Sequence, residues 1–113
     1  MREGTLIRRI LLAFALLLSA ALIPVAAADR DAAVTIDNFT FLPAQLTVAV
    51  GTRVTWTNRD DIPHTVRNDA APPAFRSPPL DTGDHYAYTF RRPGTYRYFC
   101  SLHPHMQGVV IVR

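Results

Sequence analysis

Apolar and polar residues alternate in short runs along most of the chain after residue 29. Val34 and Ile36 alternate with polar neighbours, and the pattern extends towards Phe39 and Phe41. Further alternating runs occupy residues 45–50, 53–57, 86–90, 96–100 and 109–112. A period of two residues is typical of a strand with one buried face. Many short strands at close spacing predict an all-β chain that folds as an antiparallel sandwich or barrel.

Residues that favour turns separate these runs. Gly51-Thr52 lies between two of the predicted strands, and Arg92-Pro93-Gly94 lies between two others. Residues 68–79 contain four prolines, so we expect a loop there. After residue 29 no segment of ten or more residues has helical spacing, and no repeat is visible. We therefore expect a single domain.

The first 28 residues have the three parts of a secretory signal. They begin with a short arginine-containing segment, continue with the almost wholly apolar residues 10–25, and end in Ala26-Ala27-Ala28, a small-residue cleavage site. We expect a signal peptide at 1–28, a mature domain at 29–113, and a periplasmic or otherwise extracytoplasmic location.

Retention of this segment as a membrane anchor is the alternative. The apolar run is shorter than the roughly 20 residues that a spanning helix needs, and Pro24 interrupts its end. These features favour cleavage. The export route, general secretory or twin-arginine, stays open.

Composition narrows the function classes. The formal net charge is +3, but part of that charge lies in the signal segment. The chain has no lysine, which excludes lysine-based catalysis, and no basic tail, so nucleic-acid binding is not expected. Cys100 is the only cysteine and cannot form an internal disulfide. In an exported protein it is inert and buried, paired between chains, or bound to a metal.

The segment from Cys100 to Met106 favours the metal. It places a thiolate, the imidazole of His103 and a thioether within seven residues, between two predicted strands. His64 lies upstream, after another strand pattern. Two histidines, one cysteine and a weakly bound methionine form the donor set of electron-transfer copper sites. The candidate metal ligands are therefore His64, Cys100, His103 and Met106.

These motifs resemble the cupredoxins, the type 1 blue-copper proteins that include the plastocyanins and azurins. Residues 56–64 look like the stretch that leads to the family's first histidine ligand, and residues 94–100 look like the strand that leads to its cysteine. The Cys-x2-His-x2-Met spacing is that of the short-loop, amicyanin-like branch. The resemblance implies a Greek-key β-sandwich and one type 1 copper ion held by the four candidate ligands.

The same resemblance implies how such a protein works. It is expected to be a monomer, not an enzyme, that shuttles single electrons between transient redox protein partners. These partners would dock near the exposed edge of His103. The candidates for the apolar patch around this edge are Leu42, Pro43, Pro63, Pro104 and Met106.

Other readings of single residues stay open. Many cupredoxins have asparagine after the first histidine, where this chain has Thr65, so the reduction potential cannot be carried over. His105 could bind metal, but a surface position is favoured for it and for His85. Trp56 is expected in the core. Asp60-Asp61 is interpreted as a solvated loop.

Three other functions compete with electron transfer. A periplasmic copper carrier is the main alternative, although the His-rich or Met-rich tracts of such proteins are absent. A fragment of a multicopper oxidase or nitrite reductase would need additional histidines for a second copper centre. A zinc site is possible for two histidines and a cysteine, but methionine is a poor zinc ligand.

Overall fold

The structure is a computed structural model that describes residues 30–113. The predicted signal peptide at 1–28, its cleavage site and the start of the mature domain lie outside the described residues. Within residues 30–113, no helix is both long and apolar enough to cross a membrane.

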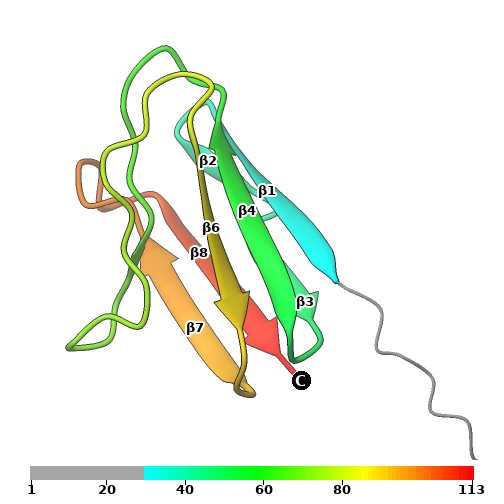
Figure 1. Ribbon diagram of the computed structural model, residues 1–113. Helices are drawn as coiled ribbons and strands as arrows, with labels where there is room; N and C mark the ends of the chain where they lie inside the picture. The colour runs from blue at the N-terminus through cyan, green and yellow to red at the C-terminus, as the bar shows by residue number, and fades with distance from the viewer. Residues whose placement is uncertain (1–29) are drawn as a thin grey trace, which may run out of the picture.

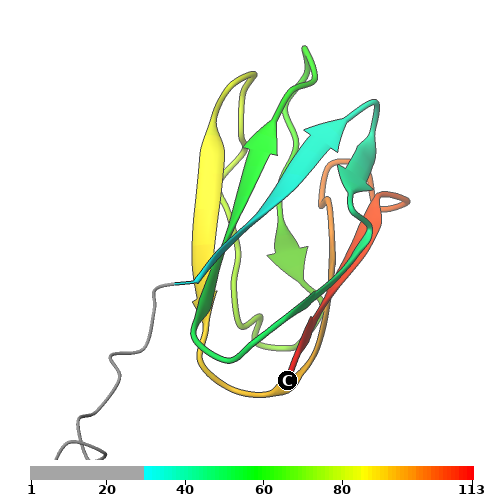
Figure 2. The same cartoon turned by 90° about the vertical axis from the view of Figure 1, so that its right-hand side faces the viewer.

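The described residues form two four-stranded sheets packed face to face (Figures 1 and 2). One sheet has the order β2-β1-β4-β6 and the other has the order β3-β8-β7-β5. The strands are β1 (Asp31–Asp37), β2 (Thr40–Leu42), β3 (Gln45–Val48), β4 (Thr52–Asn58), β5 (Arg67–Asn68), β6 (His85–Phe90), β7 (Gly94–Phe99) and β8 (Gln107–Val112). The predicted all-β sandwich is confirmed.

Two strand pairs depart from the antiparallel arrangement expected of the sandwich. β1 pairs with β4 in parallel, with Val34 opposite Trp56. β3 pairs with β8 in parallel, with Leu46 opposite Val110. The chain leaves the first sheet after the β1–β2 hairpin, adds β3 to the second sheet and returns as β4 beside β1 (Figure 2). Neighbours joined by such a crossover can run in the same direction, whereas a tight hairpin makes them antiparallel.

Hydrophobic alternation located the strands well because one face of each sheet is buried. The proline-rich segment is a loop from residue 69 onward, since Asn68 belongs to the two-residue β5. The main local difference concerns Phe39. It does not continue the alternation of β1 but lies in a two-residue turn, and the residue is 49% exposed. The buried residue of the following strand is Phe41.

An aromatic cluster fills the space between the sheets. Trp56 is fully buried, as expected, and its ring lies 5.4 Å from that of Tyr98 and 5.7 Å from that of Phe75. Burial raises the pKa of Tyr98 to about 12. Cys100 and Met106 belong to the same buried cluster. The segment that carries three candidate ligands is therefore anchored on the core through two of them.

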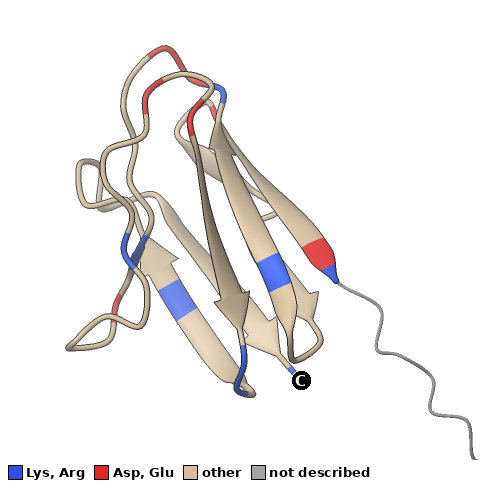
Figure 3. Cartoon of the chain, in the orientation of Figure 1, with Lys and Arg blue, Asp and Glu red and all other residues tan. Residues whose placement is uncertain are grey.

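The two ends of the sandwich differ in charge (Figure 3). The end at which β1 and β4 finish and β6 begins carries five aspartates and one arginine: Asp37, Arg59, Asp60, Asp61, Asp81 and Asp84. The opposite end carries five arginines and one aspartate: Arg30, Asp31, Arg53, Arg91, Arg92 and Arg113. Phe39, at the acidic end, contacts His103, so the candidate ligands lie near that end.

Candidate metal centre

Backbone hydrogen bonds within the segment between β7 and β8 hold that segment in one conformation. The N–H of Cys100 donates to the carbonyl of Met106 at 3.0 Å. The N–H of His103 donates to the carbonyl of Cys100 at 3.2 Å, and the N–H of Met106 donates to the carbonyl of His103 at 2.9 Å. These three bonds close a compact loop and link the backbones of the three candidate ligands to one another. The short spacing seen in the sequence is therefore a tight turn in the structure.

His64 reaches this loop from the segment between β4 and β5. Its backbone forms a bridge with Leu80, with N–H to carbonyl distances of 3.1 and 2.7 Å. Asn58, at the end of β4, is fully buried and braces the intervening loop. Its side-chain amide donates to the carbonyls of Ile62 and Leu80, and its oxygen accepts the N–H of Asp60. Every hydrogen bond in this set fixes the position from which His64 projects.

Three of the four predicted ligands come together at the sulfur of Cys100. Nδ1 of His64 lies 3.8 Å from Sγ, and Nδ1 of His103 lies 3.7 Å from it. The donor atoms of these three residues all lie within 4.8 Å of one another. His64 and Cys100 are fully buried, and Met106 is 5% exposed. His103 is only partly buried, so it connects the centre to the surface.

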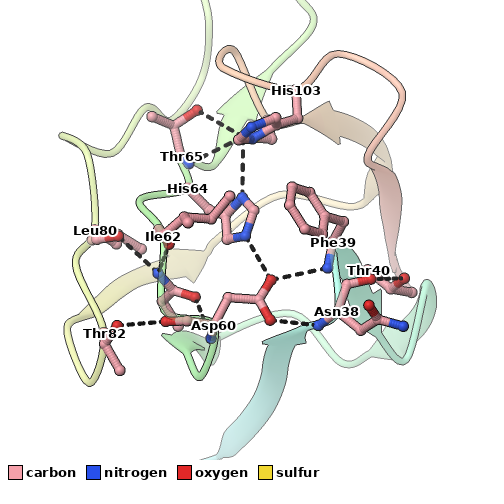
Figure 4. Close-up of polar contacts among 12 residues, drawn as sticks. Asn38, Phe39, Thr40, Asp60, Ile62, His64, Thr65, Leu80, Thr82 and His103 are labelled. Carbon is pink, nitrogen blue, oxygen red and sulfur yellow. Dashed lines mark hydrogen bonds and ion pairs between the residues drawn. The ribbon is translucent and has the colours of Figure 1, made fainter.

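Asp60 selects the nitrogen that His64 presents to the centre. Its Oδ2 lies 2.7 Å from Nε2 of His64 (Figure 4). Nδ1 is therefore free to face Cys100. The same carboxylate accepts the N–H of Asn38 at 2.6 Å and that of Phe39 at 2.9 Å. The pKa of Asp60 is lowered, chiefly by the hydrogen bond from Phe39, with His64 and Asn38 adding to it against the effect of burial.

This arrangement corrects the interpretation of Asp60-Asp61 as a solvated loop. Asp61 is exposed, as expected, but the side chain of Asp60 is only 10% exposed and bonds directly to a candidate ligand. A carboxylate that bonds the outer nitrogen of a metal-binding histidine fixes both its tautomer and its ring orientation.

Thr65 takes over much of the bracing expected of an asparagine. Its backbone N–H points at Sγ of Cys100 from 3.3 Å. Its hydroxyl accepts the N–H of Ser101 at 2.7 Å and lies 2.7 Å from the hydroxyl of Ser101. The loop that carries Cys100 is therefore tied to the residue that follows His64, through a hydroxyl pair instead of an amide.

The candidates for the apolar patch differ in their exposure. Leu42, Pro43, Pro63 and Pro104 are exposed, whereas Met106 is buried and does not belong to the patch. Two large apolar side chains that sequence reasoning left out, Phe39 and Leu102, are 49% and 50% exposed. His105 and His85 are exposed, as favoured from the sequence.

A cupredoxin-like domain family matches residues 8–112 of this chain. The chain belongs to the cupredoxin family. Amicyanin from Paracoccus versutus is 40% identical to this cupredoxin over 95 residues, which cover 79% of this chain and 72% of that protein. Amicyanin-alpha from Methylorubrum extorquens is 36% identical over 75 residues, which cover 64% of this chain and 63% of the relative.

Solved structures agree with this assignment. A purple cupredoxin from Nitrosopumilus maritimus superposes with a TM-score of 0.68 at 38% identity, covering 74% of this chain and all of that one. A reduced amicyanin mutant superposes with a TM-score of 0.70 at 36% identity, covering 77% of this chain and 86% of that one.

The donor set of this cupredoxin fits a single copper ion. Two imidazole nitrogens and one sulfur face each other inside a buried, rigid shell, with a thioether on the same loop. This combination suits copper better than zinc, because a thioether is a soft ligand that zinc rarely uses. The cofactor is one type 1 copper ion.

Proposed function

We propose that this protein is an exported type 1 copper protein that carries single electrons, with His64, Cys100, His103 and Met106 as copper ligands. The convergence of two Nδ1 atoms on one buried thiol carries the proposal. When bound, copper supplies a one-electron couple between Cu(II) and Cu(I). The chain supplies a site held on both sides by backbone hydrogen bonds, so little rearrangement is needed when the charge changes.

The geometry favours an electron carrier over an enzyme or a copper carrier. Within residues 30–113, His64, Cys100 and His103 form the only set of three or more histidine, cysteine or acidic side chains positioned to hold a metal. A multicopper enzyme needs a second centre. A copper carrier needs to exchange its ion. Of the four proposed ligands, His64, Cys100 and Met106 are each 5% exposed or less, so the site is closed to such exchange.

We further propose that residues 1–28 direct export and are removed, and that the domain from 29 onward works in the periplasm as a monomer. The charged start, apolar middle and small-residue end of that segment support this proposal.

We propose that redox partners dock over His103. The exposed apolar side chains of Phe39, Leu42 and Leu102 give that surface a small apolar contact area. A complex formed over a small area dissociates quickly. The aspartates at this end of the sandwich favour partners with basic residues around their own redox centre (Figure 3). Such complementary charge raises the rate of encounter without requiring a long-lived complex.

The copper-loaded protein tests the ligand assignment. Thiolate-to-copper charge transfer should give an intense visible band and a reversible one-electron couple with fast self-exchange. Cys100→Ser should remove the band, while His105→Ala, which alters an exposed histidine two residues from His103, should keep it. A colourless copper-loaded protein, or a Cys100→Ser variant that stays coloured, would contradict the assignment. Tight Cu(I) binding without redox cycling would instead support the copper-carrier function.

A further inference from the structure

The turn between β1 and β2 has an unusual residue at its second position. Asn38 and Phe39 are its two central residues, and both have positive φ, at 50° and 57°. Asp37 and Thr40 pair across the turn. Two-residue hairpins of this kind normally carry asparagine followed by glycine, because only glycine enters the left-handed region without steric cost. An aromatic side chain there opposes the local preference of the backbone.

The strained position places the ring of Phe39 against both candidate histidine ligands. Its centroid lies 5.3 Å from the ring of His64 and 5.1 Å from that of His103. The interplanar angles are 83° and 87°, so both contacts are edge-to-face. Figure 4 shows the Phe39 ring beside that of His64. The two imidazoles are themselves 5.0 Å apart, and the three rings form one cluster.

Asp60 ties the same turn to the metal centre. Its carboxylate accepts the backbone N–H groups of Asn38 and Phe39 and also bonds His64 (Figure 4). The conformation of the turn, the tautomer of one ligand and the position of the aromatic ring are therefore set by a single side chain. Backbone strain that is held in place by the surrounding structure often marks a functional position.

We propose that Phe39 is a positioning residue for the metal centre: its ring confines the imidazole planes of His103 and His64, and the β1–β2 turn holds it there. This inference rests on the copper-ligand assignment proposed above. Simple core packing does not account for the residue, because its side chain is half exposed. His103 has the greater need of confinement, since it is only partly buried while His64 is fully buried and hydrogen-bonded to Asp60.

Three variants separate the ring from the turn. Phe39→Gly removes the ring and fits the backbone conformation. Asn38→Gly relaxes the neighbouring turn position and keeps the ring. Phe39→Tyr keeps an aromatic ring at the strained position. All three retain the backbone N–H groups that bond Asp60, so each is expected to fold.

Ring motion in the metal-free protein is the first measurement, by nuclear magnetic resonance relaxation of isotope-labelled histidine. We expect the imidazole of His103 to become mobile in Phe39→Gly and to stay ordered in Asn38→Gly and Phe39→Tyr. The second measurement is the rate at which copper leaves the loaded protein for a chelator. We expect it to rise about tenfold in Phe39→Gly alone, the lower end of the effect of groups that orient metal ligands.

Two results would overturn the proposal. One is a Phe39→Gly variant whose His103 ring order and copper-release rate equal those of the wild type. The other is an equal change in Phe39→Gly and Asn38→Gly, which would assign the effect to the turn backbone. Because ring motion is measured without copper, a failure here is distinct from a failure of the ligand assignment, which would appear as the absence of the visible band in the wild type.

Discussion

Oδ2 of Asp60 lies 2.7 Å from Nε2 of His64, four residues away along the chain. This contact joins a candidate copper ligand to the β1–β2 turn, because the same carboxylate accepts two backbone N–H groups of that turn. The orientation of His64 is thereby fixed by the fold before a metal ion binds. Its consequences can be measured by changing the carboxylate alone.

Asp60→Asn should weaken copper binding and raise the reduction potential. The amide cannot accept hydrogen bonds from His64, Asn38 and Phe39 as a carboxylate does, and loss of a nearby negative charge favours Cu(I) over Cu(II). We expect Cu(II) affinity to fall about 10- to 100-fold, as for other groups that orient a metal ligand. Competition with a chelator and voltammetry measure the two effects.

Asp61→Asn is the matched control for this change. It removes the same charge from an adjacent, exposed side chain. If both variants shift affinity and potential equally, the effect is long-range electrostatics and the hydrogen bond to His64 has no specific role.

Thr65→Val should destabilise the ligand loop while leaving the contact between its backbone N–H and the Cys100 sulfur. The valine methyl group cannot accept a hydrogen bond, so the N–H of Ser101 would lose its partner. Position 65 itself is only 5% exposed. Ser101 itself is exposed, so water can take up its N–H, and the expected loss in the free energy of unfolding is about 0.5–1.5 kcal/mol, the net contribution of one hydrogen bond. Denaturant unfolding of the metal-free protein measures it.

Thr65→Ser keeps the hydroxyl and should retain most of that stability. The visible band should move little in either variant, because the nearest hydrogen-bond donor to sulfur is the main chain. Equal stability of the valine and serine variants would show that the hydroxyl pair contributes nothing.

The sequence predicted the strands and proposed the candidate ligands for a physical reason. Burial of one sheet face imposes alternation, and a tight ligand loop puts Cys100, His103 and Met106 within reach of one another along the chain. Pairing direction was not predictable in this way, because alternation is the same in parallel and antiparallel strands. The parallel β1–β4 and β3–β8 pairs depend on the path of the chain between the sheets.

The supporting residues of the site were also hidden in the sequence. Phe39 looked like the next apolar position of a strand, and its place over the histidines depends on a turn whose amides are bound 21 and 22 residues away, at Asp60. Nothing in the sequence marks Asn58, at the end of a strand, as the residue whose amide bonds the carbonyls of Ile62, four residues away, and Leu80, 22 residues away. Such contacts depend on how the loops pack, and a single sequence carries no periodic signal for them.

Met106→Leu should keep the visible band and raise the reduction potential. The thioether is the weakest of the four proposed ligands, so the thiolate that produces the colour stays bound. Without the thioether, Cu(II) loses more stabilisation than Cu(I), which raises the potential. Leucine has a similar volume, so the cost in the free energy of unfolding should stay below about 1.5 kcal/mol. Absorption and voltammetry decide the outcome, and an unchanged potential would remove Met106 from the ligand set.

Gly108→Ala should destabilise the fold by overpacking. A Cβ atom at this position would clash with Cζ and Oη of Tyr98. That ring is 2% exposed and packs 4.7 Å from Phe41, so it cannot move aside easily. We expect a loss of about 1–3 kcal/mol in the free energy of unfolding.

A double-mutant cycle checks the cause of that loss. In a Tyr98→Leu background the same alanine should cost clearly less, because the contacting atoms are gone. An equal cost in both backgrounds would point to the backbone of β8 instead of the side-chain contact.

The charge difference between the two ends of the sandwich predicts how electron transfer responds to salt. The proposed docking surface lies near the acidic end, so a cationic redox complex should react faster than an anionic one of similar potential, and added salt should narrow the gap. Asp37→Asn and Asp61→Asn remove exposed charges at that end and should slow the cationic reaction. Arg92→Gln, at the opposite end, should leave it nearly unchanged. If Arg92→Gln speeds the cationic reaction by as much as Asp37→Asn slows it, only the net charge matters. The acidic end then does not direct the encounter.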